Sequence, residues 1–339
     1  MKYIIHKRGL IETLQGFNKA AEVYFPIKSN SNKMLILLID QYVSGYEVES
    51  LYHARILIKT LGVSPNRILF SYQSMSLEKT NELLALQISH FAVDDVNRCR
   101  YLVDNANKLK LQLKIMLRLD IQEVLKTDLV VKWGASTSEI TFMKEYLQIH
   151  NHHFEGISYY LPQEINDLKN TFTIIDFILN RYGCDDLKAI NIGGGITPDN
   201  TVVIKKAIEA KYNKLINIFV EPGRTLLNPN IDLLVKIIDI RRKSNQKLLF
   251  IDSGIYSGLI DHIIKGRVFE IKALKNDSDI DTYLVCGNTS DISDIIGIYH
   301  LPADIKSGDE LLIKNCGAYC SEMNMHFCEN KRANYKIVD

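Results

Sequence analysis

Short apolar runs alternate with longer amphipathic segments along the first two thirds of the chain. Most of the runs are continuously apolar rather than alternating, which is typical of parallel strands buried on both faces. The runs lie at residues 23–27, 46–50, 68–72, 90–94, 113–119, 156–161, 189–192 and 217–220. We interpret them as eight strands.

The segments between the runs carry apolar residues at helical spacing. Residues 51–62, for example, place Leu51, Leu57 and Leu61 on one stripe and end at Gly62. Eight strands that alternate with helices predict an α/β fold, a parallel (β/α)8 barrel. A doubly wound open sheet is the alternative, since the periodicity does not show whether the sheet closes.

The pattern changes near residue 245. Residues 247–254, 281–288 and 309–315 are β-like runs separated by polar turns, with no long helix between them. This pattern predicts a second, mainly antiparallel β-domain. The polar stretch 241–246 marks the boundary, so we expect a barrel over residues 8–242 and a β-domain over residues 243–339, joined by residues 1–7.

Composition and charge narrow the function classes. Lys and Arg number 41 and Asp and Glu number 40, so the net charge is +1 and no nucleic-acid or membrane partner is expected. The N-terminus has no secretory apolar segment, and no apolar run is long enough to span a bilayer. Six cysteines without a CxxC pair predict a reduced, cytoplasmic protein without a metal site. They are Cys99, Cys184, Cys286, Cys316, Cys320 and Cys328.

Chemically active residues follow the predicted strands at their carboxyl ends, where barrels carry their active sites. Lys28 follows the first strand; desolvation of a lysine at a barrel mouth favours Schiff-base formation, although most lysines are solvated surface groups. Three glycines, residues 193–195, follow the seventh strand, and Arg224 follows the eighth. Exposed backbone N–H groups beside an arginine favour a phosphate site. The glycine triplet alone would fit an ordinary turn equally well.

Motifs from Tyr24 to Phe327 resemble those of the fold type III pyridoxal phosphate (PLP) enzymes, the alanine racemase-like group that includes ornithine and diaminopimelate decarboxylases. The E-P-G-R motif at 221–224 and the G-A-Y motif at 317–319 are intact. Other segments match in the same order, which argues against a chance resemblance. They are residues 24–30, 45–50, 117–118, 132–134, 191–195 and 287–294.

The resemblance assigns roles to residues of this chain. Lys28 would carry the cofactor PLP as a Schiff base, and Glu221 would pair with its pyridine nitrogen. Glu47, Arg118 and Tyr160 would line the cofactor pocket. The residues expected at the phosphate are Gly193, Gly194, Gly195, Gly223, Arg224 and Tyr319.

The resemblance also implies a homodimer with shared active sites. Ser290 and Asp291 would act at the substrate, and Asp291 would reach across into the partner subunit's site. The expected substrate is a small molecule, an amino acid. A free ornithine, lysine or arginine is one possibility, with Asp291 or Asp294 meeting its distal cation.

Glu221 distinguishes between reactions. A carboxylate at the pyridine nitrogen keeps that nitrogen protonated and makes the ring a strong electron sink. The sequence therefore predicts a lyase, a decarboxylase that removes the α-carboxylate of an L-amino acid or of an amino-acid-derived intermediate. The alternatives are an amino-acid racemase of the same fold and a catalytically inactive PLP-binding homologue.

Departures from the family pattern occur at three places in the chain. Ser290 replaces a cysteine that helps to control reprotonation after CO2 is lost, and Tyr160 replaces a histidine that stacks on the cofactor ring. Ile260 and Asp261 stand where the diaminopimelate enzymes carry a carboxylate-binding arginine, which argues against that substrate. These departures favour a specialised enzyme, as in secondary metabolite biosynthesis.

Overall fold

A computed structural model describes residues 1–339 except 73–75, 77, 184–185, 276–278, 326–327 and 329–332. Cys184 and Phe327 therefore lie outside the described residues. The chain divides into two compact units. The first comprises Thr13–Ile27 and Ile36–Pro222, and the second comprises Met1–Glu12, Lys28–Leu35 and Gly223–Asp339.

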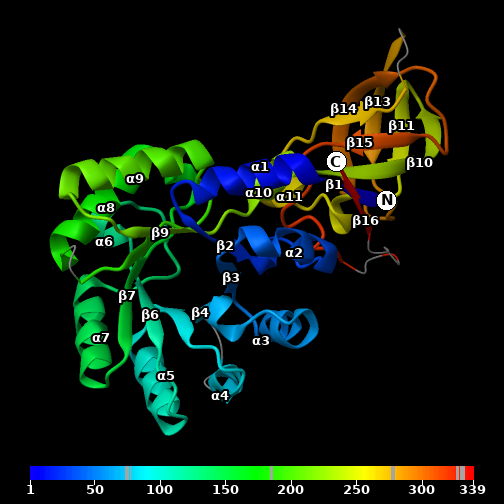
Figure 1. The fold of residues 1–339 in the computed structure, drawn as a ribbon. Coiled ribbons are helices and arrows are strands. Elements are labelled where there is room, and N and C mark those ends of the chain that lie inside the picture. Colours follow the sequence, from blue (N-terminus) through cyan, green and yellow to red (C-terminus); the bar gives the residue numbers. More distant parts are fainter. Residues whose placement is uncertain (73–75, 77, 184–185, 276–278, 326–327, 329–332) are drawn as a thin grey trace. The chain divides into compact units, whose positions relative to one another are not determined.

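The first unit is built on a closed barrel of eight parallel strands, which excludes an open doubly wound sheet. Closure is made by the pairing of the first and last strands, with Val23 opposite Val220. Every strand overlaps one of the predicted runs (Figure 1). The strands are β2 (Glu22–Pro26), β3 (Gly45–Val48), β4 (Ile68–Tyr72), β5 (His90–Val93), β6 (Lys114–Arg118), β7 (His153–Ser158), β8 (Ala189–Asn191) and β9 (Asn217–Val220).

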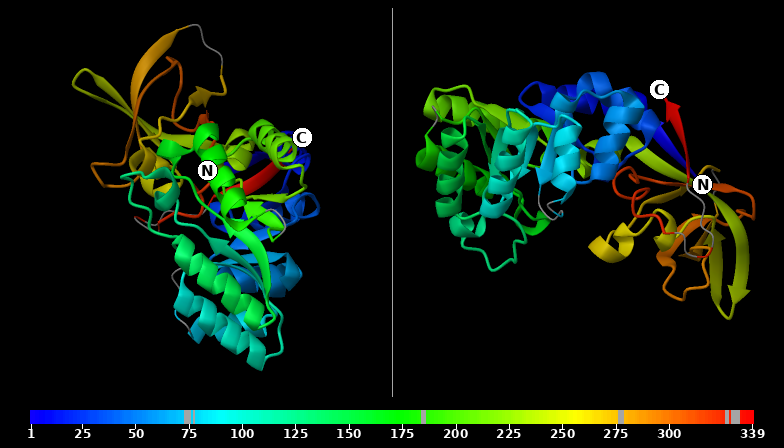
Figure 2. Two further views of the ribbon diagram at one scale, coloured as in Figure 1. Left: turned by 90° about the vertical axis from the view of Figure 1, so that its left-hand side faces the viewer. Right: turned by 90° about the horizontal axis from the view of Figure 1, so that it is seen from below.

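Helices connect these strands, and Figures 1 and 2 show α5, α7, α8 and α9 on the outside of the barrel. Polar side chains fix where the helices begin. Asp95, Asp167 and Thr197 accept backbone N–H bonds at the starts of α5, α8 and α9, and Ser136 forms a capping box with Glu139. The helices are α3 (Leu51–Arg55), α4 (Glu78–Ala85), α5 (Val96–Lys108), α6 (Gln122–Leu125), α7 (Thr137–Ile149), α8 (Leu168–Tyr182) and α9 (Pro198–Tyr212).

The inside of the barrel is filled by apolar and aromatic side chains. A buried cluster there consists of Tyr24, Leu69, Ala92, Met116, Ala189 and Phe219. His90 is buried beside it, with its ring 5.9 Å from that of Tyr24 and 6.2 Å from that of Phe219. The interior is thus a packed core, and chemistry is left to the residues that follow the strands.

The second unit is a mainly antiparallel sheet organised around the long strand β10 (Ile231–Lys243), which the sequence pattern did not predict. β10 pairs with β1, β11 and β15, and β1 also pairs in parallel with β16 (Figure 2, right). The strands are β1 (Lys2–His6), β10, β11 (Gln246–Ile251), β12 (Ile271–Ala273), β13 (Ile280–Cys286), β14 (Ile295–Pro302), β15 (Glu310–Ile313) and β16 (Asn334–Val338).

Two short helices, α10 (Arg224–Leu227) and α11 (Asp261–Lys265), also belong to the second unit, whereas α1 (Lys7–Asn18) and α2 (Lys33–Ile39) cross the division between the units. The expected boundary at 241–246 falls in the hairpin between β10 and β11. In the structure, the chain from Gly223 onward belongs to the second unit, and the strand β10 is at the centre of its sheet.

Candidate active site

The segment that carries Lys28 is bonded to the loop that carries Tyr319. The N–H of Tyr319 donates a 2.7 Å hydrogen bond to the carbonyl of Ser29, and the side-chain amide of Asn30 donates one of 3.0 Å to the carbonyl of Gly317. Ser29 and Asn30 are completely buried. Lys28 therefore extends from a backbone that is fixed on its carboxyl side.

Arg224 is held by a buried carboxylate and an aromatic ring. Its Nε and Nη2 donate to the two oxygens of Asp261 at 3.2 and 3.1 Å, and its guanidinium lies 4.4 Å from the ring centroid of Tyr319. Burial alone would lower the pKa of Arg224, but the hydrogen bonds and charge of Asp261 outweigh this and raise it. A Cβ on Gly223 would lie 3.2 Å from the Tyr319 hydroxyl, a close contact that glycine avoids. The group offers a guanidinium and a hydroxyl, two donors that suit a phosphate.

The loop that contains Ser290 and Asp291 is organised by Asp294. This buried carboxylate accepts bonds from the N–H of Ile255 at 2.8 Å and from the N–H and hydroxyl of Thr289 at 3.1 and 2.7 Å. A Cβ on Gly254 or Gly287 would come within 2.4 or 2.2 Å of its oxygens. Asp294 therefore holds the loop, and its oxygens are not available to a substrate cation.

Ser290 and Asp291 each have a neighbour that the sequence did not indicate. The hydroxyl of Ser290 lies 3.8 Å from the thiol of Cys328. Asp291 accepts the N–H of Ser293 at 2.7 Å and also hydrogen-bonds the hydroxyl of Tyr256. Burial and then the charge of Asp291 raise the pKa of Tyr256, so this tyrosine stays a donor to the carboxylate.

In the barrel unit, three predicted pocket residues lie on strands or directly after one. Glu47 lies on β3 and is completely buried. Arg118 ends β6, and its guanidinium lies 5.9 Å from the ring centroid of Tyr160, which is half exposed. Burial raises the pKa of Asp94, and the charge of Arg118 opposes this rise. The structure thus brings Arg118 and Tyr160 together.

The three glycines follow β8, and Glu221 follows β9. Gly193 and Gly195 have φ of +69° and +80°, in the left-handed region, and a Cβ on Gly194 would lie 2.7 Å from the carbonyl oxygen of Glu221. The side chain of Asn191 donates to Oε1 of Glu221 at 2.7 Å and accepts the N–H of Gly193 at 2.9 Å. One buried amide therefore joins the glycine turn to the carboxylate.

The predicted site residues thus form two groups. Glu47, Arg118, Tyr160, the glycines and Glu221 belong to the barrel unit, and the second unit holds the rest. Sequence reasoning missed three supporting residues, Asn191, Asp261 and Tyr256. Asn191 lies in the motif at 191–195, and Asp261 lies at a position that departs from the family pattern. Nothing in the sequence singled out Tyr256.

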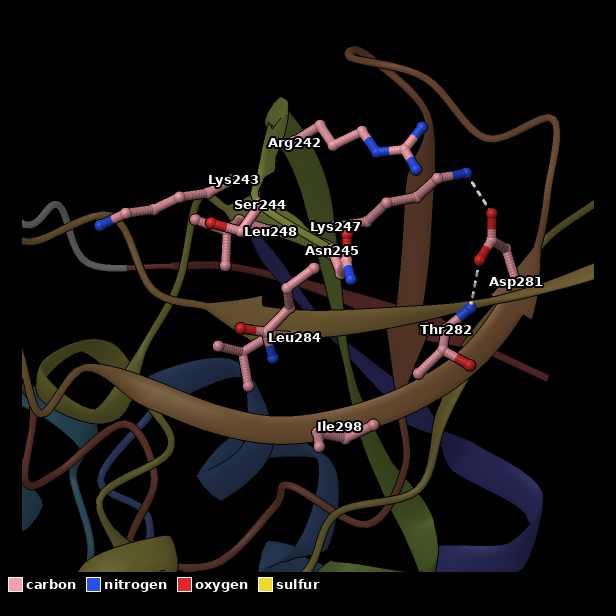
Figure 3. Close-up of a pocket in the computed structure, with 11 residues that line it drawn as sticks. Arg242, Lys243, Ser244, Asn245, Lys247, Leu248, Asp281, Thr282, Leu284 and Ile298 are labelled. Carbon is pink, nitrogen blue, oxygen red and sulfur yellow. Dashed lines mark hydrogen bonds and ion pairs between the residues drawn. The ribbon is translucent and has the colours of Figure 1, made fainter.

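A hollow of about 930 Å³ lies elsewhere, along the β10–β11 hairpin (Figure 3). Its lining includes Arg242, Lys243 and the ion pair of Lys247 with Asp281. It contains none of the predicted site residues, so it is not the candidate active site.

The described residues also bear on membrane and metal sites. No helix among them combines the length and the apolar character needed to cross a membrane. No three His, Cys, Asp or Glu side chains among them gather as a metal ion would require. The donor set that the described residues do offer suits a phosphate and a basic aromatic ring.

Residues 7–228 match the family model described as "Pyridoxal-dependent decarboxylase, pyridoxal binding domain". The chain belongs to the pyridoxal-dependent decarboxylases. Its cofactor is therefore PLP, and it is a carboxy-lyase of amino acid metabolism.

The relatives of this decarboxylase are named for two different substrates. The chain is 22% identical to the diaminopimelate decarboxylase of Aquifex aeolicus, over 99% of this chain and 86% of that protein. It is 22% identical to the ornithine decarboxylase of Schizosaccharomyces pombe, over 87% of this chain and 73% of that protein. The two names differ in substrate, so the family alone does not identify the substrate here.

Solved structures confirm the fold. The lysine/ornithine decarboxylase of Vibrio vulnificus, in complex with putrescine, matches with a TM-score of 0.85 at 16% identity, over 100% of this chain and 94% of that one. The diaminopimelate decarboxylase of Helicobacter pylori, in complex with L-lysine, matches with a TM-score of 0.84 at 19% identity, over 100% and 91%.

The residues of this decarboxylase fit PLP. In the second unit, Arg224 and the Tyr319 hydroxyl suit its phosphate. In the barrel unit, Gly193 and Gly195 have the left-handed φ of a glycine turn, which leaves room for a ligand beside the backbone. Glu221, with its oxygen Oε1 already fixed by Asn191, suits a protonated ring nitrogen.

Proposed function

We propose that this enzyme removes the α-carboxylate of an L-amino acid or of an amino-acid-derived biosynthetic intermediate, with Lys28 as the residue that carries PLP. Gly193, Gly194, Gly195, Gly223, Arg224 and Tyr319 would hold the phosphate. Glu47, Arg118 and Tyr160 would line the ring pocket. The two groups of residues are joined covalently, because Lys28 follows Ile27 and Gly223 follows Pro222 in the chain.

The observation that carries the proposal is the position of Glu221. Its carboxylate follows β9 and receives a 2.7 Å hydrogen bond from a buried amide. When bound, PLP supplies an electron sink that accepts the electron pair left on the α-carbon as CO2 departs. Glu221 would keep a proton on the ring nitrogen, because an adjacent carboxylate favours the cationic form of a base. This role favours decarboxylation over racemisation.

Ser290 and Asp291 are the residues that we assign to the substrate, and we propose that they act in the partner subunit's site of a homodimer. The carbon that loses CO2 must gain a proton. Ser290 is a weak acid compared with the cysteine that the family carries, so we expect proton delivery in this enzyme to be less strictly controlled.

Asp261 bears on the substrate class. It is bonded to Arg224 through both of its oxygens and is buried. The position where the diaminopimelate enzymes carry an arginine thus holds no cation for a second carboxylate. We propose that diaminopimelate is not the substrate, and that Asp291 meets the distal end of the amino acid.

A CO2-release screen over L-amino acids, with Glu221→Ala as the paired variant, tests the proposal. We expect one or more L-amino acids to release CO2. We expect Glu221→Ala to keep PLP, because the phosphate contacts remain, and to lose about 100-fold or more in kcat. Interconversion of enantiomers without CO2 release would replace this proposal with the racemase alternative. Bound PLP without either reaction would favour the inactive homologue.

A further inference from the structure

Asn191 is the last residue of β8, and its side chain makes two hydrogen bonds of opposite polarity. Its Nδ2 donates to Oε1 of Glu221 at 2.7 Å, and its Oδ1 accepts the N–H of Gly193 at 2.9 Å. Only 2% of Asn191 is exposed. A buried amide whose donor and acceptor are both used is fixed in orientation, because turning it over would pair donor with donor and acceptor with acceptor.

The surrounding backbone is equally fixed. Beyond the ends of β8 and β9, the N–H of Ile192 bonds the carbonyl of Phe219 at 3.0 Å, and the N–H of Glu221 bonds the carbonyl of Gly193 at 2.8 Å. The two chain segments therefore cannot separate without breaking a ladder. This ladder does not fix the rotamer of the Glu221 side chain. Among the bonds described for that side chain, the hydrogen bond from the amide of Asn191 is the one that restrains it.

We propose that Asn191 is a positioning residue for decarboxylation, which fixes the orientation of the Glu221 side chain and couples it to the glycine turn. The inference rests on the proposed role of Glu221 at the ring nitrogen. Oε1 is engaged by Asn191, so Oε2 is the oxygen that we assign to that nitrogen.

A double-mutant cycle with Glu221 tests this inference. Asn191→Ala should lower kcat by about 10- to 100-fold, the effect of losing one hydrogen bond to a charged group, and should leave KM within about threefold. In the Glu221→Ala background, Asn191→Ala should lower kcat by no more than about twofold further, since its effect passes through Glu221. Equal losses in both backgrounds would overturn the inference.

Asn191→Asp separates the two hydrogen bonds and keeps the side-chain shape, which guards against simple misfolding. It retains the acceptor for Gly193 but places a carboxylate against Glu221. Its kcat should be about 10-fold low or more, because the hydrogen bond that Asn191 donates to Oε1 of Glu221 is lost. A kcat equal to that of the wild type would contradict the proposal.

Asn166→Ser is the matched control. Asn166 also donates a side-chain hydrogen bond to the glycine turn, at 3.3 Å to the carbonyl of Gly194, but it has no described bond to Glu221. Asn166→Ser should leave kcat within about twofold of the wild type. If Glu221→Ala itself leaves kcat unchanged, the proposed function fails. If Glu221→Ala abolishes turnover but Asn191→Ala behaves as Asn166→Ser does, only the present inference fails.

Discussion

The backbone N–H of Tyr319 donates a 2.7 Å hydrogen bond to the carbonyl oxygen of Ser29. Through this bond the residue next to Lys28 and the tyrosine expected at the phosphate share one rigid framework, although they lie near opposite ends of the chain. Arg224 stacks on the same tyrosine at 4.4 Å. We therefore expect that substituting a residue that supports Tyr319 or Arg224 changes the affinity for PLP, although that residue itself does not contact the cofactor.

Asp261 is the clearest case. Asp261→Ala removes both hydrogen bonds that orient Arg224 and leaves the arginine without its buried counter-charge. We expect the Kd for PLP to rise about 10-fold, as for the loss of a charged hydrogen bond. Equilibrium dialysis of PLP against the apoenzyme measures this. Asp239→Ala is the control, since Asp239 pairs with Arg241 on the exposed part of β10, and an equal loss there would contradict the account.

The serine at position 290 predicts that the wild-type enzyme forms a side product. Some turnovers of the wild-type enzyme should place the proton on the cofactor rather than on the α-carbon, and release an aldehyde while pyridoxamine phosphate accumulates. Ser290→Cys should lower this fraction, because a thiol with a pKa of about 8.5 is a far better proton donor than a hydroxyl. Quantitation of pyridoxamine phosphate per turnover is the measurement.

Cys328 provides the control for that experiment, since its thiol lies 3.8 Å from the Ser290 hydroxyl. Cys328→Ser should leave the side reaction as it is in the wild type if Ser290 alone determines it. A wild-type enzyme that yields only amine over many turnovers would show that another group delivers the proton.

A shared active site predicts complementation between two inactive variants. Lys28→Ala and Asp291→Ala homodimers should each be inactive. Mixing them in equal amounts should restore about a quarter of wild-type activity, since half of the dimers are hybrids and each hybrid has one intact site. No recovery after subunit exchange has been verified by mass spectrometry would contradict the shared site.

His90 makes the barrel sensitive to acid. Burial, with the charges of Lys114 and His153, lowers the pKa of this histidine to about 3, whereas an unfolded histidine titrates near 6.5. The unfolded state therefore takes up the proton first, and stability falls as the pH drops from about 6.5 toward 3. At pH 4.5 this effect lowers the free energy of unfolding by about 2–3 kcal/mol. His90→Leu should abolish that decrease, as measured by urea unfolding. His300→Leu, on the exposed side of β14, should leave the pH dependence unchanged.

The sequence predicted the barrel because parallel strands that are buried on both faces consist of continuous apolar runs. β10 was not predicted because its amphipathic beginning is followed by the polar residues Arg241, Arg242 and Lys243. Its central position is evident only from its pairing with three other strands. The residues expected at PLP were found through motifs. The supporting residues were not. Asp261 contacts Arg224 and Tyr256 contacts Asp291, and the members of each pair are more than thirty residues apart in the chain. Such pairings depend on tertiary structure and leave no local pattern.

The central claim is that Lys28 carries PLP. Borohydride reduction of the purified enzyme, followed by peptide mapping by mass spectrometry, tests it most directly. We predict a single pyridoxyl group, on Lys28, that is absent from Lys28→Ala treated in the same way. A pyridoxyl group on another lysine, or its persistence in Lys28→Ala, would contradict the claim.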